Sequence, residues 1–294
     1  MGRLAVVVPV LAFLLVSCAE KDAPADIVPR QGNSVATAPE GETAAAVRLA
    51  RAPAATAAAG TAHTTIIATV GSLPGRSEPL TFRGEGEIDF LAGESRSILD
   101  LSDAMGMALT RGTELETISS DGLVYVRAPM LTSFSGASAP WVRIDPMATA
   151  QPGADALGLA PLTGLAGSDV GAPIALLNGV DVSSVRELRQ SGRADGGTTT
   201  LRAMVDLSAA ASAGATPHDL AALQRFLDRL GARRLEVEVE LDEADRLRRL
   251  VYEHAVPTPT GTVSQHFEIR YQDFGAAVDI ERPVDAEVRD LLAR

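Results

Sequence analysis

The sequence predicts an α+β fold in which a strongly curved antiparallel sheet of about eleven strands forms a half-open barrel, with helices covering its concave face. Three observations support this fold class. Apolar and polar residues alternate along many short segments, as in strands with one buried and one solvated face. Short links join these segments, so we expect consecutive strands to pair as a meander. Two apolar stretches with helical features interrupt the meander, and the inner face of the sheet is the surface available to bury them.

The N-terminus has the features of a bacterial lipoprotein signal. Residues 4–16 form an uncharged apolar run behind Arg3, shorter than the ~20 residues that a membrane-spanning helix needs. The run leads into Leu15-Val16-Ser17-Cys18, which resembles the lipobox. We therefore expect a signal peptide over residues 1–17 and attachment of palmitate-type acyl chains at Cys18, rather than a buried cysteine behind an ordinary signal. Such an anchor would hold the protein at the cell membrane, on its extracytoplasmic face.

A flexible tether and then one folded domain are expected after the cysteine. Residues 18–41 mix Pro, Gly, Ala, Ser and charged residues without any period, which is typical of a linker. The folded domain is expected over residues 42–294. Its first element is an Ala-rich helix from Glu42 to Ala59, which Pro53 either kinks or divides in two.

Beyond about residue 62 the period of the sequence changes to two. In Leu80 to Phe90, one face carries Phe82, Gly84, Gly86, Ile88 and Phe90, and the other face carries polar residues. The same alternation marks Leu235 to Asp242 and Val263 to Tyr271. Shorter strands are expected over residues 62–70, 96–102, 113–119, 122–127, 141–145, 182–191, 198–207 and 246–256. The small inner residues Gly84, Gly86 and Ala203 either let the strands bend or leave volume beneath the helices.

Two stretches are expected to cover the inner face. Thr216 and Pro217 begin a helix that ends before Gly231, and its apolar stripe contains Leu220, Leu223, Leu227 and Leu230. The stretch from Ala154 to Asn178 is also rich in leucine and is interrupted by glycine and proline. It is compatible with a plain buried helix pair and with a movable lid.

The expected hairpin of residues 246–256 and 263–271 shows whether His254 and His266 could bind one metal ion. Pairing Leu250 with Ile269 and Tyr252 with Phe267 puts apolar residues on one face, so that His254 lies inside and His266 outside. The two histidines then cannot share a metal ion, and no metal site is expected. An inner His254 is compatible with a satisfied core histidine or with contact to a lipid headgroup.

Composition excludes several classes of function. The formal net charge of -12 and the 4% of aromatic residues argue against nucleic-acid binding. Lys21 is the only lysine, which removes P-loop and Schiff-base chemistry, and no G-x-S-x-G motif occurs. The acidic rows at 85–89 and 236–240 lie on wet strand faces, where we expect them to serve solubility rather than glycoside cleavage. The arginines at 246–249 indicate a charged hairpin turn, with headgroup binding as the alternative. We expect no enzyme activity and no cofactor.

These features together resemble a known family. The chain resembles the actinobacterial LppX/LprG-type lipoproteins of the LolA/LolB-like superfamily. The resemblance rests on the lipobox, the N-terminal helix, the strand meander, the mid-chain apolar insertion and two short pieces, Asp121-Gly122-Leu123-Val124-Tyr125-Val126-Arg127 and Pro140-Trp141-Val142-Arg143-Ile144-Asp145. The resemblance spans roughly residues 42–282. It implies a half-barrel whose apolar cavity holds acyl chains, and a role in carrying lipids or lipoglycans without catalysis. The arginine-rich, lysine-poor usage fits a GC-rich actinobacterium.

The expected function is therefore binding and carriage or presentation of an acylated lipid or lipoglycan. Partners would be that ligand, the membrane through the anchor, and an envelope transporter or other membrane protein. The candidate lipid-binding residues are Phe82, Ile88, Phe90, Leu99, Tyr125, Leu201, Val237, Val239, Tyr252 and Phe267, with Leu220, Leu223 and Leu227 from the covering helix. The alternative is an envelope sensor that binds a protein partner, as regulators of anti-sigma factors do, and carries no lipid.

Overall fold

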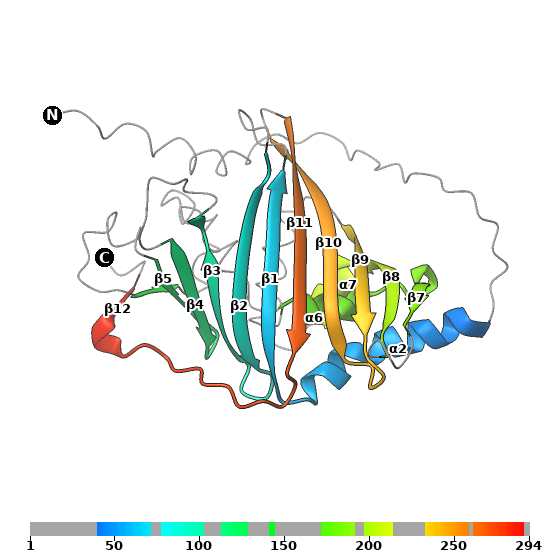
Figure 1. Ribbon diagram of the computed structural model, residues 1–294, viewed down its shortest axis with the longest axis horizontal. Coiled ribbons are helices and arrows are strands. Elements are labelled where there is room, and N and C mark those ends of the chain that lie inside the picture. Colours follow the sequence, from blue (N-terminus) through cyan, green and yellow to red (C-terminus); the bar gives the residue numbers. More distant parts are fainter. Residues whose placement is uncertain are drawn as a thin grey trace.

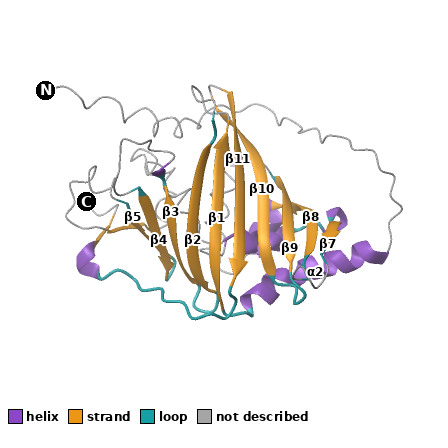
Figure 2. Cartoon of the chain, in the orientation of Figure 1, coloured by secondary structure: helices purple, strands orange, loops and turns teal. Residues whose placement is uncertain are grey.

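A computed structural model describes residues 40–71, 78–102, 113–128, 141–144, 172–191, 197–213, 233–258 and 261–290. In these residues the chain is an α+β fold built on one open, curved sheet of 12 strands, with few helices (Figures 1 and 2). Helices α6 (Ala172–Leu176) and α7 (Leu207–Ala213) lie behind the sheet in Figure 1, and α2 (Glu40–Ala57) runs along one end of it. The predicted fold class is confirmed.

The strands agree closely with the predicted alternating segments. They are β1 (Thr61–Gly71), β2 (Leu80–Asp89), β3 (Glu94–Asp100), β4 (Glu114–Ser120), β5 (Leu123–Arg127), β6 (Trp141–Ile144), β7 (Arg186–Gln190), β8 (Thr199–Asp206), β9 (Arg234–Leu241), β10 (Leu247–Thr258), β11 (Gly261–Gln272) and β12 (Val288–Asp290). All neighbouring strands pair antiparallel except β12 and β6, which are parallel.

Three elements differ from the expectation. The segment 182–191 begins with a short 3-10 helix, η4 (Val182–Ser184), before β7 starts. Helix α7 and strand β12 were not predicted. Of the apolar stretch 154–178, the described part forms α6 and the 3-10 helix η3 (Leu177–Gly179), and the expected helix from Pro217 to Leu230 lies outside the described residues.

The sheet consists of two meanders joined at its centre. Its strand order is β12-β6-β5-β4-β3-β2-β1-β11-β10-β9-β8-β7, so the first described strand pairs with one of the last. In the β1–β11 pair, Ile66 faces Ile269 and Ala68 faces Phe267. A single meander would have placed β6 beside β7, whereas these strands lie toward opposite edges of the sheet.

Helix α2 is held to the sheet by buried and partly buried hydrogen bonds as well as by apolar packing. It runs unbroken through Pro53. The Arg48 guanidinium donates to Asp245 Oδ1 at 2.6 Å and to Thr199 Oγ1 and the Asp242 carbonyl, both at 2.7 Å. Thr56 Oγ1 accepts the Leu247 N–H at 2.8 Å. These bonds fix the helix across the ends of β8, β9 and β10.

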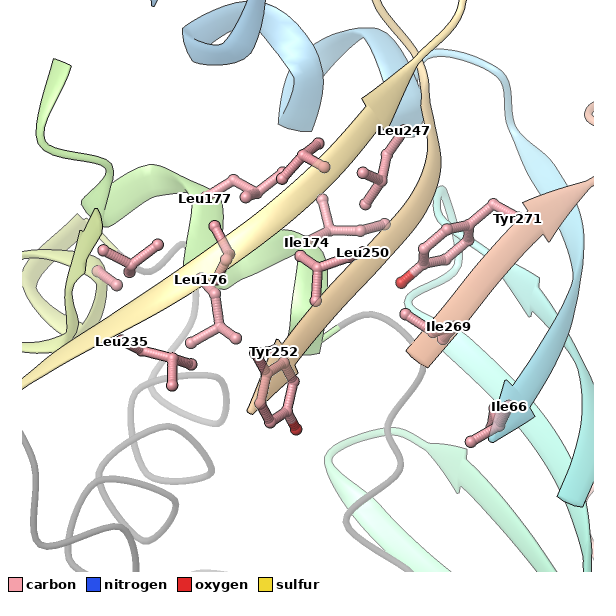
Figure 3. Close-up of a cluster of buried hydrophobic side chains, with 14 of the residues drawn as sticks. Ile66, Ile174, Leu176, Leu177, Leu235, Leu247, Leu250, Tyr252, Ile269 and Tyr271 are labelled. Atoms are coloured by element: carbon pink, nitrogen blue, oxygen red, sulfur yellow. The ribbon is translucent and has the colours of Figure 1, made fainter. Parts of the chain in front are cut away.

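The main core lies between one face of the sheet and the helices. We call this the inner face. Figure 3 shows Ile174, Leu176 and Leu177 of α6 and η3 beside Leu247, Leu250 and Tyr252 of β10. Leu49 of α2 and Leu207 of α7 belong to the same buried cluster.

A second, smaller core lies on the opposite, outer face. It contains Ile118, Tyr125 and Trp141, and Ile280 and Val288 pack against it. The last two residues belong to the C-terminal strap, residues 273–290, which runs from β11 along one end of the sheet to β12 at its edge (Figure 1). The strap therefore covers the outer face near β4, β5 and β6.

Candidate ligand-binding face

The inner face is built from rows of side chains that run across the strands. One row crosses eight strands, from β8 to β4, with Leu201, Val239, Leu250, Ile269, Ile66, Gly84, Leu99 and Leu115. The next row contains Ala203, Val237, Tyr252, Phe267, Ala68 and Phe82. Because these residues share strand registers, the period-two pattern of the sequence becomes a continuous apolar surface.

Part of this surface is already covered by protein. Leu201, Val237 and Val239 have at most 1% of their surface exposed and lie in the cluster that contains α6, η3 and α7. Leu99, Ile88 and Phe82 are buried too, with at most 6% exposed. These residues therefore act as core, and a ligand would reach them only by displacing what covers them.

A second part of the inner face is only half-buried. It contains Ala68 and Val70 of β1 and Phe267 of β11, which pack against the edge of the core. Tyr252 stacks on Phe267 with ring centroids 5.0 Å apart, and the His254 ring lies 6.0 Å from Tyr252. We call the partly buried Ala68, Val70, His254 and Phe267, together with the buried Tyr252 that stacks on Phe267, the half-buried patch. Of the predicted candidates, the structure brings Tyr252 and Phe267 together here, with Phe82 beside them opposite Ala68.

Tyr125 was expected on the inner face, and that placement is wrong. Tyr125 pairs with Ile118, while Val124 and Val126 point to the inner face and Val126 joins the main core. The segment Leu123-Val124-Tyr125-Val126 is apolar at every position, so its pattern does not indicate which face is inside. Tyr125 packs beside Trp141 in the outer cluster instead.

Phe90, another candidate, lies just beyond the end of β2. It is half-buried and packs against the main core, and its N–H donates to the Gly60 carbonyl at 2.9 Å. Cys18, Leu220, Leu223 and Leu227 lie outside the described residues, as do the expected signal peptide and most of the expected tether.

The inner glycines bring neighbouring side chains close. A Cβ at Gly84 would lie 2.9 Å from Leu99 Cδ2 and 2.6 Å from the Ile98 carbonyl oxygen. A Cβ at Gly86 would lie 2.8 Å from Thr64 Oγ1. Leu99 and Thr64 therefore occupy much of the room that a side chain at these positions would need.

His254 and His266 lie on opposite faces, in the predicted register. His254 is paired with Gln265 on the inner face, where burial lowers the pKa of its imidazole to about 4, only partly offset by a hydrogen bond with Gln265. Its Nδ1 is buried and has no hydrogen-bond partner in the part of the chain that the structure describes. The ring is therefore neutral near pH 7. His266 instead contacts Glu253 at 2.9 Å on the exposed face.

The charged residues of the central strands gather on the outer face. Arg249 bonds Glu238 at 2.8 Å and Glu268 at 3.0 Å, and Arg270 bonds Glu268 at 2.6 Å. Burial alone would raise the pKa of Glu268, but the hydrogen bonds from the two arginines outweigh it and the pKa is lowered. The acidic residues Glu238 and Glu268 therefore form ion pairs with arginines on the outer face.

The arginines near the β9–β10 turn also have partners within the chain. Arg246 bonds Asp242 at 2.8 Å, and the guanidinium groups of Arg246 and Arg248 lie 4.7 and 5.6 Å from the Phe274 ring centroid. Within the described ranges, no cluster of three or more His, Cys, Asp and Glu side chains could hold a metal ion. In the same part of the chain, no helix is both long and apolar enough to cross a membrane.

Sequence reasoning missed two members of the half-buried patch. Ala68 and Val70 were not named as candidates, although they share the parity of Ile66 in a segment predicted to be a strand. Extending that parity along residues 62–70 would have found them. Their contact with Phe267 could not be read from the sequence, because it depends on the pairing of β1 with β11.

Comparisons with known proteins give weak similarity. The sequence matches no family model and no curated protein. Among solved structures, a LolA superfamily protein from Nitrosomonas europaea is 10% identical with a TM-score of 0.32, and the match covers 78% of this chain and 91% of that chain. The MucA/MucB complex of Pseudomonas aeruginosa gives 15% identity and a TM-score of 0.31, covering 84% of this chain and 60% of the matched chain. TM-scores this low establish neither a common fold nor a function, so the strands and their registers alone define the architecture.

Proposed function

We propose that this protein binds an acylated lipid or lipoglycan on the inner face of its sheet and carries or presents it at the cell envelope, without catalysis. The observation that carries the proposal is the half-buried patch. It adjoins an apolar surface that crosses eight strands, and it includes two stacked aromatic rings. An open sheet with such a face can accept acyl chains by apolar contact alone, at about 0.8 kcal/mol for each methylene removed from water.

The charge distribution supports the same choice of ligand. Along β1 to β6, no inner position of the described strands carries a charged residue, while the outer face of the neighbouring strands carries ion pairs. A charged group bound against the inner face would lose its hydration without gaining a partner. The proposal therefore places long apolar chains there.

The location at the membrane is a separate proposal that rests on the sequence. The lipobox-like residues 15–18 would provide a lipid anchor at Cys18, and a tether would let the folded domain stand off the bilayer. A carrier in this position could receive lipid from an envelope transporter or another membrane protein and pass it on.

The test is native mass spectrometry of protein purified without detergent, followed by extraction and identification of bound lipid. The proposal expects adducts with the mass of acyl lipids, released by organic solvent. Consistent absence of such adducts, together with failure to take up lipid from vesicles, would refute the carrier function.

One feature favours the alternative of a protein-binding module. Strand β7 is an edge of the sheet and all five of its residues are exposed, so its outer edge could pair with a strand of a partner. Its sequence, Arg-Glu-Leu-Arg-Gln, is rich in charge and its pairing with β8 is bulged, which are features that protect edges against pairing. Cross-linking in membranes that captures a stoichiometric protein partner through β7, with no lipid bound, would support this alternative.

A further inference from the structure

Five hydroxyl residues form a polar cluster within the apolar inner face. Thr64 of β1, Ser95 and Ser97 of β3, and Thr117 and Ser119 of β4 occupy inner positions in two neighbouring rows. All five are at least 94% buried, with exposed fractions between 1% and 6%. We call them the hydroxyl cluster.

Two of these hydroxyls have no hydrogen-bond partner among the described residues. They are Thr64 Oγ1 and Thr117 Oγ1, whose residues are only 1% and 3% exposed. A buried hydroxyl without a partner carries a desolvation penalty that a valine of the same shape would avoid. The residue that faces Thr64 is Gly86, and a Cβ there would lie 2.8 Å from the Thr64 oxygen, so a larger residue at 86 would crowd this hydroxyl.

The hydroxyl cluster lies next to the long apolar row of the inner face. Ser97 and Thr117 lie two residues along their strands from Leu99 and Leu115, which are members of the long apolar row. The inner face is thus apolar along the middle of the sheet and carries hydroxyls nearer the β2–β3 and β4–β5 turns. An amphipathic ligand that lies along the strands and displaces what covers these buried residues would place its chains on the first region and its polar group on the second.

The chemistry of the cluster selects a neutral group. Hydroxyls can both donate and accept hydrogen bonds, as the hydroxyl groups of a sugar do. The inner positions of β1 to β6 hold no charged residue that could pair with a phosphate. The nearby buried carboxylate, Glu116, lies on the outer face with Arg96 and Arg127.

The spacing indicates the size of this group. Thr64 and Thr117 belong to strands three positions apart, which at about 4.8 Å per strand corresponds to roughly 14 Å between the strand backbones. A glycerol hydroxyl alone is too small to reach both residues, whereas a head of about two sugar units has the required length.

We propose that the hydroxyl cluster binds the neutral glycan head of an acylated lipid, with Thr64 and Thr117 as its two outer contacts. The inference rests on the proposed lipid-binding function and specifies its ligand as a neutral glycolipid. It distinguishes this ligand from a phospholipid with the same chains and from a lipid without a head.

The experiment compares three probes with identical acyl chains, which are digalactosyl dipalmitoylglycerol, dipalmitoyl phosphatidylglycerol and dipalmitoylglycerol. Binding is measured by native mass spectrometry and by titration with delipidated protein. We expect the wild type to prefer the digalactosyl lipid. The double variant T64V/T117V should bind it about 5- to 100-fold more weakly, as expected for the loss of two hydrogen bonds, and should bind dipalmitoylglycerol as the wild type does.

Two controls separate a binding role from a structural one. Thr69→Val removes a hydroxyl on the outer face of β1, where Thr69 lies 3.5 Å from the hydroxyl of Thr81, and should leave the preference unchanged. The melting temperature of free T64V/T117V should equal or exceed that of the wild type, because the lost hydroxyls bond to no described residue.

The outcomes separate this inference from the proposed function. If the double variant keeps the full preference for the digalactosyl lipid, the hydroxyls hold only buried water and the inference is wrong, while lipid binding stands. A wild-type preference for phosphatidylglycerol also overturns it. If the wild type binds none of the three probes, the proposed function fails, and the inference fails with it.

Discussion

A bulky residue in the half-buried patch should block acyl chains without disturbing the rest of the sheet. Ala68 is the smallest member of the patch and lies between Phe267 on one neighbouring strand and Phe82 on the other. Replacing it with phenylalanine puts a ring over the surface where a chain would lie. If the ring displaces about four methylenes, at about 0.8 kcal/mol each, the loss is about 3 kcal/mol, or roughly 100-fold in affinity.

The assay is a fluorescence titration of delipidated protein with a fluorescent hexadecanoyl probe. Thermal unfolding is followed in parallel, since overpacking can destabilise the fold by about 1–3 kcal/mol. Thr69→Phe is the matched control, because it adds a ring at the adjacent position on the outer face. Unchanged affinity in a folded Ala68→Phe variant would refute the placement of the chains, and so would an equal loss in the control.

Three further predictions concern pH, ion pairing and anchoring. The folded-state pKa of His254, about 4, lies below its ordinary 6.5, so its contribution to stability is present above pH 6.5 and is lost as the pH falls toward 4. The loss is at most about 3 kcal/mol, and His254→Phe should flatten the pH dependence of urea unfolding between pH 7 and 4.5; an identical dependence in both proteins would contradict this. Glu268→Gln removes a carboxylate partner of Arg249 and should lower the free energy of unfolding by about 2 kcal/mol at pH 7. Because the pKa of Glu268 is lowered from 4.5, the difference should begin to shrink only as the pH falls below about 4.5, and a difference equally large at pH 3 and pH 7 would contradict the ion-pair explanation. Cys18→Ser should move the protein from the membrane to the soluble fraction in a cell fractionation, whereas retention in the membrane would show that the anchor lies elsewhere.

The strands could be predicted because one of their faces is polar. In β9, Leu235, Val237 and Val239 alternate with glutamates, and the segment was found to within one residue at each end. The register of Leu250 with Ile269 followed from the same parity and is confirmed. Alternation gives a strand and its inner face whenever only one face is buried.

The inner face of β5, the C-terminal strap and helix α7 could not be predicted, because they depend on contacts between distant parts of the chain. The inner and outer faces of β5 could not be distinguished, because the C-terminal strap covers the face that holds Tyr125. The strap itself has no regular pattern, and its strand β12 is three residues long. Helix α7 has the sequence Leu-Ser-Ala-Ala-Ala-Ser-Ala, which has no apolar stripe.

The hydroxyl cluster shows a different limit of sequence reasoning. Ser95, Ser97, Thr117 and Ser119 look like ordinary polar positions in the sequence, and small polar residues usually face water. Ser95 and Ser97 share the parity of Leu99, a predicted inner residue, so parity alone would place them on the inner face. Their contact with Thr117 and Ser119 of β4 depends on strand pairing and could not be read from the local pattern.

Photo-crosslinking tests the central claim, that acyl chains bind at the inner face, most directly. The protein is loaded with palmitate that carries a diazirine near the end of its chain, irradiated, digested and analysed by mass spectrometry. The account predicts adducts on inner-face residues of β1, β10 and β11, at or next to Ala68, Val70 and Phe267. Adducts confined to exposed apolar residues such as Leu91 and Leu188, or no adducts at all, would contradict it.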